Sequence, residues 1–407
     1  MYTIIIYLYL FAAKIASLFS KKVKLMIDGH KQVFELLRDQ IDKNERYVWF
    51  HAASLGEFEQ GRPLMERMRR IHPEYKILLT FFSPSGYEVR KNYSGADVIC
   101  YLPFDTPRNV QRFLELANPC MAFFIKYEFW QNYLKALKQR RVPTYSVSSI
   151  FRSEQIFFRW YGGQYYKVLT LFTHFFVQNE QSRQLLATRG VTNVTVVGDT
   201  RFDRVAEIHA QATSLAVVER FKGDSMVLVA GSSWQPDEAL LIEYFNTHPG
   251  LKMIIAPHVV SEEHLSEIEK MLKRASVRYT QAVESGSVGA DCMIVDCYGL
   301  LSSIYGYGEI AYVGGGFGVG IHNVLEAAVY EIPVLFGPNN QRFREACGLL
   351  ETGGGFEVHD YADFSALLDR MLADSNYLRQ CGEKAGRYVA DNTGATDVIL
   401  RKVGLVK

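Results

Sequence analysis

Short apolar runs alternate with amphipathic stretches along most of the chain. In the first half, runs rich in β-branched and aromatic residues predict strands, and helical patterns such as 57–71 and 109–116 lie between them. This alternation is typical of a parallel sheet with helices on both faces. The strands predicted in the first half are 47–52, 76–81, 97–102, 121–125, 144–148, 174–178 and 193–197.

The alternation stops at residues 201–223, which are polar and alanine-rich, and then begins again. Residues 361–402 have the pattern of helices only. A chain of 407 residues is long for one core and comfortable for two. We therefore predict two doubly wound, Rossmann-like α/β domains facing a central cleft, residues 25–200 and 224–407, with an interdomain link at 201–223. The second-half strands are predicted at 226–230, 252–256, 277–280, 292–295, 309–313 and 333–336.

The N-terminus is the most apolar part of the chain. Residues 1–20 are interrupted by a single lysine and are followed by Lys21, Lys22 and Lys24, whereas a cleaved secretory signal begins with its basic residues. The length lies between those of a spanning and an interfacial helix, because crossing a bilayer takes ~20 apolar residues. We expect residues 1–24 to be a membrane-anchor helix, with the lysines and the main body on the cytoplasmic side. A buried core helix is the alternative.

Composition excludes several classes of protein. Hydrophobic content of 48% and charged content of 22% describe a folded globular chain, and the net charge of +1 gives no electrostatic case for a nucleic-acid partner. The six cysteines form no C-x-x-C pair, which favours free thiols. The chain has no H-E-x-x-H motif and no D-x-D pair, so we expect no protein-held metal and no cofactor.

Residues 312–326, YVGGGFGVGIHNVLE, combine the end of a predicted strand, five glycines and a helix predicted over 322–330. Glycine lets a backbone approach a phosphate, and a helix start presents unpaired N–H groups. Asn323 and Glu326 are three residues apart on the first turn, so both face one way. A turn that only lets the helix pack tightly on the sheet is the alternative, since the spacing fits neither a P-loop nor G-x-G-x-x-G. The candidate donor-binding residues here are Gly315, Gly316, Asn323 and Glu326.

Other loops after second-half strands carry hydrogen-bonding groups. Ser232 and His258 suit a phosphate, although an isolated histidine is more often structural. Residues 298–301 have the composition to form one wall of a base site. These loops add Ser232, His258, Gly299 and Leu300 to the candidate donor-binding residues.

Two loops of the first half carry carboxylates. Glu57 follows the strand 47–52 and opens the next helix, where a carboxylate either stabilises the helix dipole by ~0.3–1 kcal/mol or acts as a general base. Glu128 lies between two aromatic residues, which can desolvate it or stack on a sugar; a helix cap with buried aromatics is an equal alternative. Arg152 and Arg201 follow later strands and can bind a carboxylate or phosphate, with an Arg201–Asp203 salt bridge as the alternative.

Four motifs together resemble the 3-deoxy-D-manno-octulosonic acid (Kdo) transferases of lipopolysaccharide synthesis. HAASLGE is similar to that family's H-x-x-S-x-G-E, KYEFWQN to E-x-W-P-N, GDTRFD to G-(N/D)-x-(K/R)-(F/Y)-D, and GGGFGVGIHNVLEAA to G-G-S…G-G-H-N-x-L-E-x-A. Their order agrees throughout, and the match covers nearly the whole chain. The departures are Gln131 for proline, Gly316 for serine, Ile321 for glycine, and His258 near a frequent arginine.

The resemblance implies a GT-B fold, CMP-Kdo as donor, a lipid A precursor (lipid IVA) as acceptor and metal-independent inversion. It implies an acceptor-binding first domain, a nucleotide-sugar-binding second domain, and attachment to the inner membrane with the catalytic body in the cytoplasm. Glu57 matches the family's catalytic carboxylate, Glu128 a second glutamate of the acceptor side, and Asn323 and Glu326 its donor-site residues.

These inferences join into one hypothesis. Glu57 takes the proton of an acceptor hydroxyl, and the glycine loop and helix start bind the CMP phosphate in place of a metal. Arg152 or Arg201 pairs with the carboxylate of the sugar. The rivals are another GT-B enzyme, such as a UDP-sugar transferase or a 2-epimerase, and a non-enzymatic membrane-associated scaffold.

Overall fold

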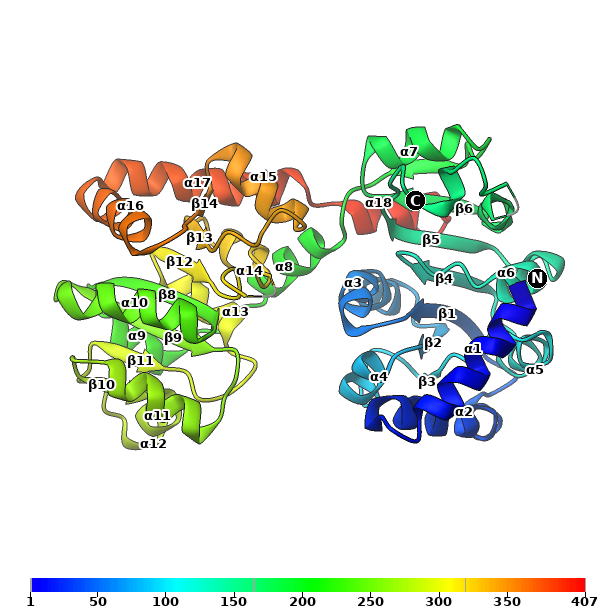
Figure 1. The fold of residues 1–407 in the computed structure, drawn as a ribbon, viewed down its shortest axis with the longest axis horizontal. Helices are drawn as coiled ribbons and strands as arrows, with labels where there is room; N and C mark the ends of the chain where they lie inside the picture. The colour runs from blue at the N-terminus through cyan, green and yellow to red at the C-terminus, as the bar shows by residue number, and fades with distance from the viewer. Residues whose placement is uncertain (1, 164, 319, 407) are drawn as a thin grey trace. The chain divides into compact units, whose positions relative to one another are not determined.

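A computed structural model describes residues 2–163, 165–318 and 320–406, and the chain divides into two compact units. Unit 1 contains residues 1–204 and 393–407, and unit 2 contains residues 205–392. Each unit is built on one seven-stranded sheet whose paired strands are parallel, with helices around it (Figure 1). The prediction of two doubly wound, Rossmann-like α/β domains is confirmed.

The sheet of unit 1 has the strand order β3-β2-β1-β4-β5-β6-β7. The chain runs outward from β1 to β3 and then returns to add β4 on the other side of β1. Ligands of such sheets bind at the carboxyl ends of the strands where the order reverses, here between β1 and β4. The strands are β1 (Arg46–Ala52), β2 (Tyr75–Phe81), β3 (Val98–Tyr101), β4 (Met121–Ile125), β5 (Thr144–Ser149), β6 (His174–Val177) and β7 (Val194–Val196). The helices are α1 (Tyr2–Ala16), α2 (Lys21–Gln40), α3 (Leu55–Ile71), α4 (Pro84–Arg90), α5 (Pro107–Ala117), α6 (Gln131–Gln139), η1 (Ile156–Phe158), η2 (Tyr166–Leu171), α7 (Glu180–Ala187) and α18 (Ala395–Lys402).

The sheet of unit 2 has the order β10-β11-β9-β8-β12-β13-β14, so its reversal lies between β8 and β12. Its strands are β8 (Met226–Ser233), β9 (Leu251–Pro257), β10 (Ser276–Arg278), β11 (Cys292–Ile294), β12 (Ile310–Val313), β13 (Val334–Phe336) and β14 (Gly355–Glu357). Its helices are α9 (Ala216–Lys222), α10 (Gln235–Thr247), α11 (Glu262–Met271), α12 (Tyr279–Ser285), α13 (Leu301–Ile304), η3 (Tyr305–Tyr307), α14 (Leu325–Ala328), α15 (Arg344–Thr352), α16 (Tyr361–Ala373) and α17 (Ser375–Asp391); α8 (Arg201–Ala210) crosses the boundary between the units.

The helix after the glycine-rich segment is shorter than predicted. The prediction placed it over 322–330, but α14 has four residues and begins at Leu325. Asn323 precedes it, and its side-chain oxygen accepts the Leu325 N–H at 3.2 Å. A single helical turn carries little of the dipole on which the phosphate argument rested, so any anion site here depends on the loop.

The last helix belongs to unit 1, whereas the sequence analysis grouped all closing helices with the second domain. Ile399 and Leu400 of α18 are fully buried in the core of unit 1, where α18 packs on α3. The Asp203 carboxylate accepts the N–H of Gly394 at 2.5 Å and that of Thr396 at 2.7 Å, which fixes the start of α18. The helical pattern was predicted correctly, but its packing partner is far away in sequence.

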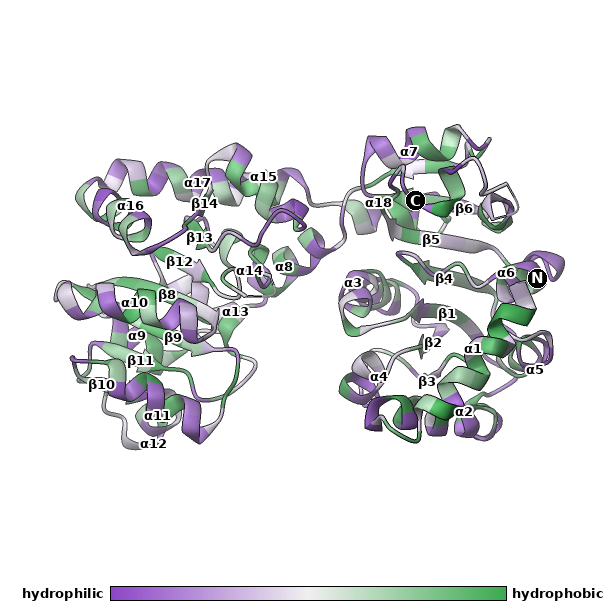
Figure 2. Cartoon of the chain, viewed as in Figure 1, coloured by the Kyte–Doolittle hydropathy of each residue, from purple (hydrophilic) through white to green (hydrophobic). Residues whose placement is uncertain are grey.

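The apolar N-terminus forms a helix that packs on unit 1 and leaves much of its surface in solvent. Ile4, Leu8 and Phe11 are 64%, 63% and 66% exposed, and α1 is strongly hydrophobic (Figure 2). The expectation of a membrane-anchor helix over residues 1–24 is corrected, because α1 ends at Ala16 and α2 begins at Lys21. In the part of the chain that the structure describes, no helix combines the length and apolarity needed to cross a bilayer.

Candidate functional site

Glu57 lies where the sheet order of unit 1 reverses. It is in the first turn of α3, directly after β1, and its Oε2 accepts the N–H of Ala53 at 2.6 Å and of Ser54 at 3.2 Å. These bonds are the reciprocal half of a capping box and hold the side chain in place. Glu57 therefore does stabilise the start of α3, as the structural alternative predicted. This role uses Oε2 only, since the described residues donate no hydrogen bond to Oε1.

Glu128 follows β4, the strand next to β1, and the structure brings it to the same edge as Glu57. Its Oε2 accepts the indole N–H of Trp130 at 2.6 Å and lies 3.0 Å from Nε2 of His51. His51 is fully buried at the end of β1, and its Nδ1 lies 2.9 Å from Oγ1 of Thr80 on β2. Three neighbouring strands thus hold the Glu128 carboxylate through one hydrogen-bonded chain.

The surroundings raise the proton affinity of Glu57. Burial, and then the nearby charge of Glu128, raise the pKa of the Glu57 carboxyl to about 7, against the opposing effects of His51, the Ala53 N–H and Lys126. A carboxyl with this pKa exchanges its proton near neutral pH. This is the property that a general base at the mouth of a sheet requires.

The two candidate arginines of unit 1 differ in their surroundings. Arg201 donates from Nε and Nη2 to Oδ2 of Asp199 at 3.0 and 2.8 Å. Its ion-pair partner is therefore Asp199, not Asp203 as the sequence analysis suggested, because Asp203 holds the start of α18. Arg152 is exposed and lies beside Tyr127, where it opposes the rise that burial causes in the pKa of the phenol. Arg152 is thus the candidate next to the Glu128 loop.

Two glycines of the glycine-rich loop in unit 2 are required by close packing of the backbone. A Cβ on Gly314 would lie 2.4 Å from the Ser232 carbonyl oxygen, and one on Gly316 would lie 2.5 Å from Cα of Gly337. The packing alternative of the sequence analysis holds at these two positions. The N–H of Gly315 is also used within the protein, because it donates to Oδ2 of Asp237 at 2.9 Å. Among the described residues, the amide N–H groups of Gly316 and Phe317 have no acceptor, so they replace that of Gly315 as candidate anion donors.

Asp237 organises this loop and was missed by the sequence analysis. It is 1% exposed, its Oδ2 also accepts the N–H of Trp234 at 2.9 Å, and its Oδ1 accepts the hydroxyl of Tyr312 at 2.7 Å. One carboxylate therefore connects the start of α10, the strand β12 and the glycine loop. The detectable signal was an acidic residue three positions after the loop residue Trp234, which is capping-box spacing.

Three rings stack across the loops that follow β8, β9 and β12. The Trp234 and His258 rings lie 4.5 Å apart at 25°, and the His258 and His322 rings lie 4.4 Å apart at 24°. The Trp234 indole N–H donates to Nε2 of His322 at 3.2 Å, and burial followed by the charge of His258 lowers the pKa of His322. His258 is therefore not an isolated histidine, since the fold places it against the glycine loop. Neither Trp234 nor His322 was among the candidate residues predicted from the sequence.

The remaining donor-site candidates form a second group in unit 2. Asn323 donates from Nδ2 to Oε1 of Glu326 at 3.0 Å, and Ser302 donates from Oγ to the other carboxylate oxygen at 2.9 Å. The Glu326 side chain is thereby connected to α13, the helix that directly follows Gly299 and Leu300. Ser232 lies at a β-bulge with φ of +53°, an unfavourable region for a residue with a side chain.

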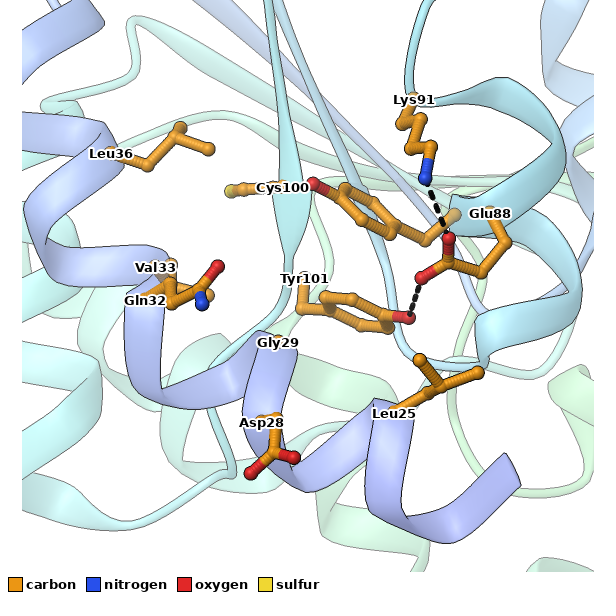
Figure 3. A pocket seen from close by; sticks show the side chains of 11 residues that line it. Leu25, Asp28, Gly29, Gln32, Val33, Leu36, Glu88, Lys91, Cys100 and Tyr101 are labelled. Carbon is orange, nitrogen blue, oxygen red and sulfur yellow. Dashed lines mark hydrogen bonds and ion pairs between the residues drawn. The ribbon is translucent and has the colours of Figure 1, made fainter. Parts of the chain in front are cut away.

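Two cavities, one in each unit, are not lined by these carboxylates. One, of about 340 Å³, lies between α2, α4 and β3 of unit 1 (Figure 3). In this cavity the Glu88 carboxylate accepts hydrogen bonds from Lys91 at 2.8 Å and from the Tyr101 hydroxyl at 3.4 Å. The two charged side chains Glu88 and Lys91 therefore pair with each other. The other, of about 360 Å³, borders Trp234 and His264 in unit 2. Within the described ranges, no group of three or more His, Cys, Asp or Glu side chains is placed to hold a metal ion.

Comparison with known proteins gives consistent matches. A family model described as 3-deoxy-D-manno-octulosonic-acid transferase (kdotransferase) matches residues 29–204. A 3-deoxy-D-manno-octulosonic acid transferase of Aquifex aeolicus is 28% identical, over 80% of this chain and 86% of that protein. Another, of Haemophilus influenzae, is 24% identical over 87% of this chain and 85% of that protein. The crystal structure of UDP-GlcNAc 2-epimerase from Neisseria meningitidis bound to UDP-GlcNAc superimposes with a TM-score of 0.61 at 14% identity, over 88% of this chain and 99% of that chain, which shows a similar fold.

We expect Asp237→Ala to destabilise unit 2. The change removes the acceptor of the part-buried Trp234 N–H and of two buried donors, the Gly315 N–H and the Tyr312 hydroxyl, and each unpaired buried donor costs about 1–3 kcal/mol. Denaturant unfolding should show a loss of at least about 2 kcal/mol. The control is Glu243→Ala, an exposed carboxylate on the same helix. Equal stability of the two variants would contradict the role assigned to Asp237.

Proposed function

Because this chain belongs to the family of Kdo transferases, which are glycosyltransferases, we propose that it moves Kdo from CMP-Kdo to a lipid A precursor, lipid IVA. The reaction would proceed without a metal and with inversion at the anomeric carbon. The observation that carries the proposal is Glu57, whose carboxyl has a pKa raised to about 7 and whose second oxygen is left without a donor.

The chemistry assigned to unit 1 is activation of the acceptor. The ionised Glu57 takes the proton of a sugar hydroxyl, whose oxygen forms the bond to the anomeric carbon of Kdo while the bond to the CMP phosphate oxygen breaks. Glu128, held by His51 and Trp130, keeps the proton affinity of Glu57 high enough for that transfer. Arg152 is the better placed arginine for the carboxylate of Kdo, because Arg201 is paired with Asp199.

The chemistry assigned to unit 2 is binding of the donor and stabilisation of the leaving phosphate. The amides of Gly316 and Phe317, with Ser232 and His258, supply hydrogen-bond donors at the carboxyl ends of β8, β9 and β12. Preorganised backbone hydrogen-bond donors stabilise a developing negative charge without reorganisation of the site. Asn323 and Glu326 are proposed to contact the nucleoside, beside Gly299 and Leu300.

The proposed location is the cytoplasmic face of the inner membrane, where the lipid acceptor resides. The exposed apolar residues of α1 support attachment in the plane of the interface, and Lys21, Lys22 and Lys24 follow them on the side expected to face anionic headgroups. We do not assign a cofactor or a nucleic-acid partner.

Glu57→Gln should abolish transfer. Glutamine keeps an acceptor oxygen for the capping box but cannot take a proton, so kcat for Kdo transfer should fall by about 10²–10⁴-fold. The assay incubates purified protein with CMP-Kdo and lipid IVA and identifies the lipid product by mass spectrometry. The matched control is Glu59→Gln on the same helix, whose carboxylate pairs with Arg90 at 2.8 Å. Near wild-type turnover by Glu57→Gln, with the fold intact, would refute the base assignment.

Nucleotide binding separates the proposal from its rivals. A ligand that binds only the folded state raises the melting temperature, so CMP should stabilise the protein and UDP should not. The fold alone permits a UDP-sugar transferase or a 2-epimerase. Either of these enzymes should be stabilised by UDP and not by CMP. A non-enzymatic scaffold requires stabilisation by neither nucleotide and no turnover of any nucleotide sugar. Thermal unfolding with each nucleotide at matched concentration decides among the three.

A further inference from the structure

A surface aromatic segment remains outside the proposed function. Residues 156–163, here called the aromatic loop, follow β5 of unit 1. Trp160 is 92% exposed and Tyr161 is 58% exposed, and their rings meet edge to face at 5.4 Å and 88°. Two large neighbouring aromatic side chains in solvent are uncommon on a soluble surface and mark a contact with another apolar phase or partner.

The loop holds these rings outward by a fixed backbone. Phe157 packs against Phe129 at 5.0 Å and Phe158 against Phe151 at 5.8 Å, so the start of the loop is anchored in the core. The Gly162 N–H donates to the Arg159 carbonyl at 3.0 Å, and a Cβ on Gly162 would lie 1.8 Å from the Ile156 carbonyl oxygen. The turn therefore needs glycine and presents Trp160 and Tyr161 in a defined direction.

The aromatic loop and α1 both lie next to the segment that follows β4. The Tyr2 hydroxyl, at the start of α1, donates to Asp105 at 2.6 Å and accepts the N–H of Gln131, the first residue of α6, at 3.4 Å. Further along α1, Tyr9 lies 6.4 Å from Phe82, whose ring is 4.7 Å from that of Trp130.

Residues 129 and 130 therefore have α1 on one side and the aromatic loop on the other. Phe129 contacts Phe157 of the loop, while Trp130 contacts the α1 side and donates to the Glu128 carboxylate. The two exposed apolar surfaces border the segment that carries the candidate acceptor site.

The charge around the loop is mainly positive. Arg152, Arg159 and Lys167 are exposed, with Glu154 as the acidic neighbour. The Arg159 guanidinium donates from Nε to the Glu154 backbone carbonyl at 3.1 Å, and no carboxylate in the described ranges forms an ion pair with it. Tryptophan and tyrosine beside basic residues are the side chains that settle at the headgroup level of an anionic bilayer.

We infer that the aromatic loop is a second membrane contact, in which Trp160 and Tyr161 enter the interface of an anionic bilayer beside α1 while Arg159 meets the headgroups. The inference rests on the proposed membrane-bound function and deepens it. One helix lying flat allows unit 1 to roll about the helix axis. A second contact across residues 129–130 removes that freedom and turns the Glu57–Glu128 edge toward the lipid acceptor.

The direct test is fluorescence quenching of the full chain on vesicles of phosphatidylcholine and phosphatidylglycerol whose acyl chains carry bromine. The chain has four tryptophans, so Trp160→Phe supplies the signal of the other three. Wild-type emission should be quenched by the brominated vesicles more than that of Trp160→Phe. Identical quenching of the two proteins would overturn the inference.

Vesicle binding gives an independent measure. The double change Trp160→Ser/Tyr161→Ser should weaken partitioning about tenfold, whereas Val283→Ser, a half-exposed apolar residue of unit 2, should leave it unchanged. Transfer to a detergent-dispersed acceptor should stay at the wild-type rate in the double variant. If Leu8→Ser/Phe11→Ser abolishes binding and the loop variant binds as wild type, α1 is the sole contact and the inference fails. Because vesicle binding is read without turnover, this failure is distinguishable from failure of the proposed reaction.

Discussion

The carboxylates of Glu57 and Glu128 lie at one edge of the parallel sheet of unit 1, and their proximity raises the pKa of Glu57. Glu128 accepts a hydrogen bond from Trp130 and lies 3.0 Å from Nε2 of His51, so its carboxylate is held close to Glu57. Glu57 is fixed in turn by the backbone at the start of α3. Neither side chain can turn away, and the pKa of Glu57 is therefore raised by burial and by its neighbour. The hydrogen bonds that cap α3 also orient the carboxylate proposed as the base.

Unit 2 has the same kind of sheet reversal as unit 1 and carries the candidate donor-binding residues there. Its candidate residues lie at the reversal between β8 and β12, where a buried Asp237 holds the glycine loop to the start of α10. Because α14 has only four residues, the loop backbone and not a helix dipole is the candidate anion site of unit 2. Glycine is needed at 314 and 316 because neighbouring backbone occupies the space of a side chain. Among the described residues, the amides of Gly316 and Phe317 have no acceptor within the protein, which makes them the candidate donors.

Local patterns predicted the features that depend on local physics. The strand and helix alternation predicted two parallel α/β domains, although it did not predict β14. Glu57 and Glu128 were each placed after a predicted strand, but the pairing of β1 with β4, which brings them to one edge, was not predicted. Contacts distant in sequence could not be read in this way. Arg201 pairs with Asp199 although Asp203 is equally near in sequence, because Asp203 is drawn to residues 394 and 396. The roles of Asp237 and of α18 likewise depend on partners that only the folded chain supplies.

The most direct test of the central claim is the pH dependence of kcat/KM for Kdo transfer in the wild type and in Glu128→Gln. With Glu57 as the base, activity should rise with pH as its carboxyl loses a proton, with an inflection at about 7. Removing the charge of Glu128 should move that inflection to lower pH, because the ionised Glu57 then meets less repulsion. A wild-type inflection near the ordinary value of 4.5, or one that Glu128→Gln leaves in place, would contradict the account.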